Sequence, residues 1–126
     1  MFVSISVPIF PSEDPEKVKN AVLNIFPNAV LEVTEKRMEG TSPDIDRFKQ
    51  KIRSQKILDT SRSVMIKGQR GNRTTINLNK QVALAGTVSY TEERTILGAI
   101  KVTIEDDDIL AFIDRTAPNT VEGEEV

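Results

Sequence analysis

The chain has 126 residues and a mass of 14.0 kDa, with 38% hydrophobic and 29% charged residues, which is typical of one ordinary globular domain. It contains no cysteine and no histidine, so thiolate or imidazole zinc sites, Ser-His-Asp triads and cysteine nucleophiles are excluded. No apolar stretch approaches the ~20 residues of a transmembrane helix, and no signal-peptide pattern is visible. We therefore expect a non-catalytic, cytoplasmic protein without a cofactor or metal.

The formal net charge of −2 conceals a segregation of charge along the chain. Residues 36–80 carry twelve basic and four acidic side chains, whereas the rest of the chain carries five basic and fifteen acidic ones. Clustered lysines and arginines attract phosphates whatever the net charge of the whole molecule. The basic middle segment therefore favours an anionic polymer as partner, and a helix surface that lysines keep soluble is the alternative.

The first third of the chain predicts a β-α-β unit. Residues 2–9 alternate between apolar and polar positions, as in a half-buried strand. Ser12 and the acids after it resemble a helix start, and helical spacing of apolar residues continues to about Phe26. Residues 29–34 alternate again, so we expect a second strand, which ends in charged residues before Gly40.

The basic middle segment predicts two consecutive helices or one bent helix. Residues 41–44 form a second helix start, and apolar residues follow at helical spacing up to Ile52. The phase then breaks, and a new helical register begins at Ile57. Gly68 suits a left-handed cap at the end of the third helix.

The last third returns to a period of two. We predict strands over residues 73–78, 82–90 and 100–104, the first two paired as a hairpin around Asn79–Gln81, and a final helix that ends near Pro118. The fold class is therefore α+β: a two-layer domain over residues 1–118 with a mostly antiparallel sheet and helices on one face, in the order β-α-β-α-α-β-β-β-α. Residues 119–126 are expected to form a flexible acidic tail. Five strand residues should pack against the helices: Ile5, Leu31, Leu78, Val88 and Val102.

Three segments have side chains that suit ligand binding, and each has a structural alternative. The loop 67–73 combines glycines with three bases, as a phosphate site requires; it is only weakly similar to the Gly-x-x-Gly loop of KH domains, and a helix cap explains its glycines equally. Donors at Asn77 and Asn79–Gln81 suit base edges and phosphates, or simple turn chemistry. The acids at 105–108 suit magnesium, or the N-terminal dipole of a helix.

Aromatic residues are few, and Phe2 and Tyr90 are the rings that we expect at the surface. Recognition of RNA would then depend on shape and backbone rather than on base stacking. The predicted nucleic-acid-binding residues are Arg47, Lys49, Lys51, Arg53, Lys56, Arg62, Lys67, Arg70, Arg73, Asn79, Lys80 and Gln81.

Several short motifs are distinctive: Ile57-Leu58-Asp59-Thr60-Ser61-Arg62, Gly68, Leu78-Asn79-Lys80-Gln81, Gly86, Leu97-Gly98, Ile113-Asp114 and Ala117-Pro118. Together they resemble an archaeal protein family described as RNA-binding and as an exosome-associated subunit. The resemblance covers nearly the whole chain and implies a fold similar to the large-subunit ribosomal protein that binds five-S RNA. It implies RNA as partner and no catalytic residue. One departure is Thr87, where members of the family often carry a base.

Two other functions stay open on the sequence alone. The basic face suits a protein-protein or assembly module, which would bind an acidic partner or form a homodimer. A carboxylate-metal hydrolase ranks third, because a sequence does not show whether its acids converge. RNA binding through phosphates is distinguished from a hydrophobic dimer by its steep weakening with salt.

Overall fold

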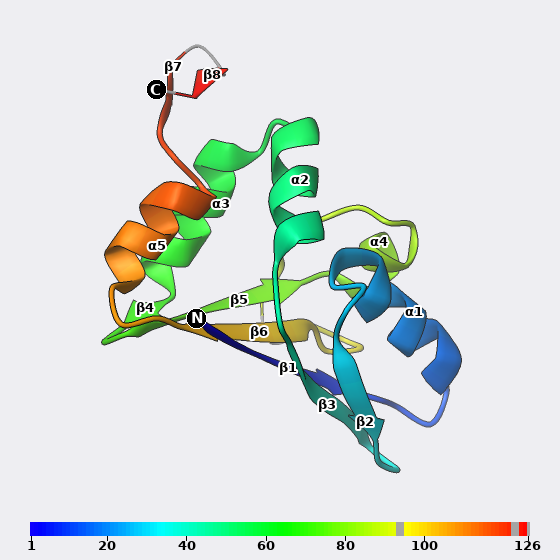
Figure 1. The fold of residues 1–126 in the computed structure, drawn as a ribbon. Coiled ribbons are helices and arrows are strands. Elements are labelled where there is room, and N and C mark those ends of the chain that lie inside the picture. The colour runs from blue at the N-terminus through cyan, green and yellow to red at the C-terminus, as the bar shows by residue number, and fades with distance from the viewer. Residues whose placement is uncertain (93–94, 122–123, 126) are drawn as a thin grey trace.

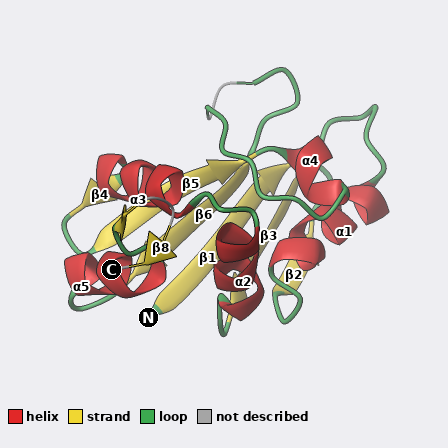
Figure 2. Ribbon diagram, turned by 90° about the horizontal axis from the view of Figure 1, so that it is seen from above, coloured by secondary structure: helices red, strands yellow, loops and turns green. Residues whose placement is uncertain are grey.

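The computed structural model describes residues 1–92, 95–121 and 124–125. As predicted, it is an α+β fold, in which helices lie on one face of an antiparallel sheet (Figures 1 and 2). The sheet has six strands in the order β2-β3-β1-β6-β5-β4: β1 (Phe2–Pro8), β2 (Val30–Val33), β3 (Arg37–Ser42), β4 (Gln69–Arg70), β5 (Arg73–Leu78) and β6 (Ile100–Glu105). The helices are α1 (Pro15–Ile25), α2 (Asp46–Ser54), α3 (Leu58–Lys67), α4 (Lys80–Leu84) and α5 (Ile109–Thr116).

The core lies between the sheet and the helices. On the central strand β1, Val3, Ile5 and Val7 are fully buried, whereas Ser4 and Ser6 point to the open face of the sheet. The same alternation runs along β5 and β6. The predicted burial of Ile5, Leu78 and Val102 is confirmed, with Leu31 partly buried against the core. Val88 also belongs to the core, but it lies in the loop after α4 and not on a strand.

The predicted helix phases in the basic segment are also confirmed. Phe48 is fully buried and its ring stacks on Phe26 with centroids 5.9 Å apart, while Val64 packs partly buried against the core. Lys51 and Arg53 are only partly buried. Among the described residues, no helix has the length and apolar character needed to cross a membrane.

Strand β3 was not predicted. It pairs with both β1 and β2 and lies where the sequence suggested only charged residues and a helix start. Met38 is its buried apolar residue, so the strand lacks the alternation of several apolar side chains that a prediction needs. At Gly40 a Cβ would lie 2.0 Å from the carbonyl oxygen of Val30, so the close pairing with β2 requires glycine.

The predicted strand over residues 82–90 is wrong. The chain forms the short helix α4 instead, because the Asn79 side chain accepts a hydrogen bond from the Val82 amide at 3.0 Å and caps it. Gly86, with φ of +85°, follows the helix. The chain then returns to the edge of β5 through an isolated bridge between Leu78 and Tyr90.

Two helix ends also differ from the prediction. Asp14, not Ser12, caps α1, because its carboxylate accepts a hydrogen bond from the Glu16 amide at 3.0 Å. Gly68 is not left-handed, with φ of −85°. Lys56 adopts a left-handed conformation, with φ of +58°, in the turn between α2 and α3.

The predicted acidic tail falls partly outside the described residues. Within them, β7 (Thr120–Val121) pairs with β8 (Glu124–Glu125) in a separate two-stranded ribbon. The Thr120 hydroxyl donates a hydrogen bond to the Asp59 carboxylate at 2.7 Å, which places the ribbon beside the start of α3.

Candidate nucleic-acid interface

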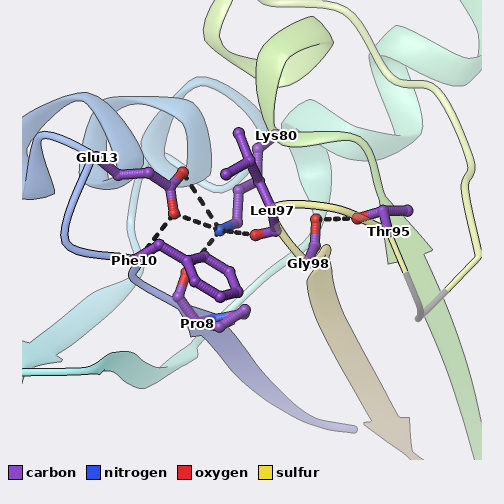
Figure 3. A network of polar contacts seen from close by, with 7 residues as sticks. All are labelled: Pro8, Phe10, Glu13, Lys80, Thr95, Leu97 and Gly98. Atoms are coloured by element: carbon purple, nitrogen blue, oxygen red, sulfur yellow. Dashed lines mark hydrogen bonds and ion pairs between the residues drawn. The ribbon is translucent and has the colours of Figure 1, made fainter.

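Lys80 lies inside the fold rather than at a hairpin tip (Figure 3). Its Nζ donates hydrogen bonds to the Pro8 carbonyl at 2.6 Å, to the Glu13 carboxylate at 3.0 Å and to the Leu97 carbonyl, and the ammonium lies 5.4 Å from the centre of the Phe10 ring. The side chain is 6% exposed, so all its donors are used within the protein. The structure therefore corrects the predicted position of Lys80: this lysine joins the start of α4 to the end of β1 and to the loop before β6.

The neighbouring amides do not form the predicted cluster of donors either. Asn79 is occupied as the cap of α4, and Gln81 is exposed on the first turn of that helix. Asn77 lies on the open face of β5, and its Oδ1 is buried without a hydrogen-bond partner among the described residues. The hairpin tip expected to present these side chains is absent because the second strand of that hairpin is a helix.

Three of the predicted basic residues hold the helices together. Lys51 donates to the Gly86 carbonyl from one side of α2, and Arg53 donates to the Thr116 carbonyl of α5 at 3.2 Å from the other side. Arg62 forms an ion pair with Asp114 of α5 at 2.6 Å. Lys51 therefore joins α2 to the loop after α4, whereas Arg53 and Arg62 join α2 and α3 to α5.

The remaining bases are accessible. Within the described part of the chain, four predicted side chains make no hydrogen bond or ion pair: Arg47, Lys49, Lys56 and Lys67. Arg70 and Arg73 are exposed on β4 and β5. The Arg70 guanidinium donates to the Lys67 carbonyl at 3.1 Å, and Arg73 lies 4.0 Å from Glu105, which is the outer limit of an ion pair.

Lys67, Arg70 and Arg73 form what we call the hairpin cluster. Arg70 and Arg73 are cross-strand partners on β4 and β5, and Lys67 ends the helix that leads into β4. The turn between the strands has Gly71 at φ of +59°. The carbonyl of the following residue, Asn72, accepts a hydrogen bond from the Asp106 amide at 3.0 Å. The predicted glycine loop with three bases is therefore a tight hairpin tied to the end of β6.

The hairpin cluster is separated from Lys56, which precedes the helix α3. This helix has ten residues, so it separates Lys56 from the cluster by roughly 15 Å at 1.5 Å per residue. Arg47 and Lys49 lie on the first turns of α2. Three of the predicted RNA-binding residues therefore lie at or beside the hairpin, and three others, Arg47, Lys49 and Lys56, lie on α2 and in the turn after it.

Two of the acids at 105–108, Asp106 and Asp108, have structural roles at the start of α5. Asp108 accepts a hydrogen bond from the Ala111 amide at 3.2 Å and caps the helix, while Asp106 accepts one from the Asp108 amide at 3.0 Å. This arrangement follows the helix-dipole explanation of these acids. Among the described residues, no three acidic side chains converge as metal ligands would.

Tyr90 does not present its ring for stacking. Its hydroxyl donates a hydrogen bond to the fully buried Ser61 hydroxyl at 2.6 Å, and the ring packs against the core. Burial raises the pKa of Tyr90 from 10.0 to about 12, and the Ser61 hydrogen bond lowers it by less. Phe2, the other ring expected at the surface, is 54% exposed.

The protein is a small α+β domain with accessible bases on α2, at the end of α3 and on the β4–β5 hairpin. A family model described as RNA binding matches residues 2–105. The chain is 39% identical to the UPF0201 protein of Methanothermobacter thermautotrophicus, covering 98% of this chain and 96% of that one. The chain belongs to this RNA-binding family, whose relatives are archaeal UPF0201 proteins.

Two further comparisons support this assignment. The crystal structure of the UPF0201 protein from Methanococcus jannaschii has a TM-score of 0.93 and 36% identity, over 100% of this chain and 99% of that one. A UPF0200/UPF0201 protein of Archaeoglobus fulgidus is also 39% identical, over 98% of this chain. The chain spans only 39% of that longer relative.

Proposed function

We propose that the protein binds structured RNA through its phosphate backbone, with the hairpin cluster as the principal contact and Arg47, Lys49 and Lys56 as a second one. The family description supports RNA as the ligand. The observation that carries the site is the pairing of Arg70 with Arg73 on one exposed hairpin, with Lys67 at the end of the helix that leads into it. Phosphates bind there without displacing a close ion pair, because the nearest carboxylate of Arg73 is 4.0 Å away.

The proposal includes a non-catalytic role in the cytoplasm, within RNA processing or an exosome complex, and a relation to the ribosomal protein fold that binds five-S RNA. The family resemblance supports this wider context. Affinity purification of the tagged protein from its native host, with and without ribonuclease, tests it. Recovery of RNA-processing subunits is the expected result, and recovery of none of them would contradict the processing role.

Filter binding of a hairpin RNA at several salt concentrations tests the interface. In the variant Lys67→Glu, Arg70→Glu, Arg73→Glu, we expect weaker binding and a salt slope that is about 2 to 3 units shallower, since each lost phosphate contact removes ~0.9 units for duplex sites. The matched control carries the same change of charge at Lys17→Glu, Lys19→Glu and Lys36→Glu, and should keep most of the slope. Absence of RNA binding by the wild type at low salt would overturn the function, and equal losses in both variants would overturn the site.

A second candidate function is self-association through the outer strand β2. Val30 and Val33 are 73% and 48% exposed there, and β2 ends the sheet, with one free edge. Exposed apolar strand edges pair readily with other chains. Light scattering at high salt distinguishes this function, because an apolar dimer survives salt that releases RNA.

A further inference from the structure

A hollow of about 620 Å³ opens beside the hairpin cluster. It lies between the hairpin turn, the end of β6 and the start of β1, and its lining includes Phe2, Arg70, Asn72, Arg73, Glu105 and Asp107. Its volume falls within the ~300–1,000 Å³ of small-ligand sites. The hollow therefore combines cations, carboxylates and an aromatic ring.

The strand register places these groups side by side. Glu105 of β6 is the partner of Arg73 on one side and of Phe2 on the other. Cross-strand partners share a face of the sheet, and two strand spacings put Phe2 and Arg73 about 10 Å apart at Cα. Phe2 points to the open face because Val3, the next residue, is fully buried in the core.

The ring of Phe2 is exposed, and its backbone is held in the sheet. It is 54% exposed, and β1 pairs with β6 from this residue onward. Aromatic rings on a sheet surface bind unpaired bases by stacking, whereas bases inside an A-form helix are not accessible to them. A stacked base at Phe2 would bring its phosphate within reach of Arg73 and Arg70.

We propose that this hollow binds one unpaired nucleotide of the RNA, with its base stacked on Phe2 and its phosphate held by Arg70 and Arg73. The inference rests on the proposed RNA-binding function and narrows the ligand to structured RNA with a loop or bulge. Glu105 and Asp107 are acceptors for the exocyclic amino groups of adenine, cytosine and guanine, which uracil lacks. The site therefore prefers an amino-bearing base.

Tryptophan fluorescence tests the stacking directly, because the chain contains no tryptophan. In the variant Phe2→Trp, we expect a stem-loop RNA with unpaired adenosines to quench the emission, and a blunt duplex of equal length to leave it unchanged. Val30→Trp is the matched control, since Val30 also lies on the open face but on the edge strand β2, two strands from β1 and on the side away from the hairpin cluster. Its emission should not respond to either RNA.

Filter binding supplies the energetic test. Phe2→Ala should weaken binding of the adenosine stem-loop by about tenfold and leave the duplex unaffected, because stacking contributes ~1–3 kcal/mol per base. A uridine loop should bind more weakly than the adenosine loop. Circular dichroism melting of each variant verifies folding.

The results separate the two proposals. If the hairpin-cluster variant loses RNA while Phe2→Ala binds both RNAs as the wild type does, or both RNAs quench Phe2→Trp equally, the nucleotide site is overturned and backbone binding stands. Absence of any wild-type affinity for RNA at low salt overturns both. Selective loss of the stem-loop with selective quenching supports the nucleotide site.

Discussion

The Lys80 ammonium lies 3.0 Å from the Glu13 carboxylate in an ion pair whose side chains are 6% and 13% exposed. The pair joins the first turn of α4 to the segment before α1, and the carbonyls of Pro8 and Leu97 accept the remaining hydrogen bonds. The motif Leu78-Asn79-Lys80-Gln81, which is part of the family resemblance, thus contains a structural lysine.

Replacement of Lys80 by methionine should lower the free energy of unfolding by about 3 kcal/mol, because it leaves a buried carboxylate and two carbonyls without their donor. Urea denaturation followed by circular dichroism measures this change. RNA affinity of the folded variant should equal that of the wild type. A stable Lys80→Met protein with greatly reduced RNA affinity would show that Lys80 contacts RNA.

Replacement of Lys56 by glycine should stabilise the fold and weaken RNA binding. Lys56 occupies the left-handed position after α2, where the Lys56 amide donates to the Arg53 carbonyl and the Ile57 amide donates to the Ile52 carbonyl, each at 3.0 Å. Lys56→Gly should raise the free energy of unfolding by about 0.5–1 kcal/mol, because glycine adopts this conformation without steric cost. Lys56→Ala is the control: it should not gain this stability, and both variants should lose the same RNA affinity. Thermal melting and filter binding measure the two effects.

Tyr90 should make stability fall at high pH. Its pKa is raised to about 12 in the folded protein against 10.0 for an unperturbed tyrosine, so the folded state retains the proton more tightly. The contribution of Tyr90 to the free energy of unfolding is fully present below pH ~10. It decreases by up to about 1.4 kcal/mol per pH unit as the pH rises toward 12, because the tyrosine then ionises in the unfolded chain but not in the folded protein. Tyr90→Phe should remove this component, so the difference between the two urea curves isolates it from lysine titration. Identical pH dependence of both proteins would contradict the prediction.

Two glycines near the hairpin cluster should respond differently to alanine. At Gly68 an added Cβ would lie 2.2 Å from the Thr75 carbonyl oxygen, so Gly68→Ala must displace β5 and should cost about 2–3 kcal/mol. At Gly71 the space is open and only the φ of +59° opposes alanine, which should cost about 1 kcal/mol. Chemical denaturation of both variants measures the difference. A larger loss in Gly71→Ala would contradict the steric explanation.

Periodicity in the sequence was sufficient where one element buries one face. The alternation along β1 and β6 and the helical spacing of Phe48 and Ile52 predicted buried residues that the structure confirms. It failed at β3, where Met38 is the buried apolar residue, and at residues 82–90, where Asn79 caps a helix. In both places a single side chain or a strand pairing, rather than a repeated pattern, decides the local structure.

For the candidate site, residue types and their order were enough to establish the segregation of charge, the exclusion of thiolate and imidazole chemistry and the glycine loop with its bases. That this loop is a hairpin was decided by the pairing of β4 with β5. Which of those bases are available follows from contacts across the fold. Lys80, Arg53 and Arg62 are bound to carbonyls and carboxylates of segments distant in sequence, whereas Arg70 and Arg73 extend from the sheet edge. The partners of such a side chain are set by the packing of helices and the register of strands. Because those partners are distant in sequence, the residue types around the side chain do not reveal them.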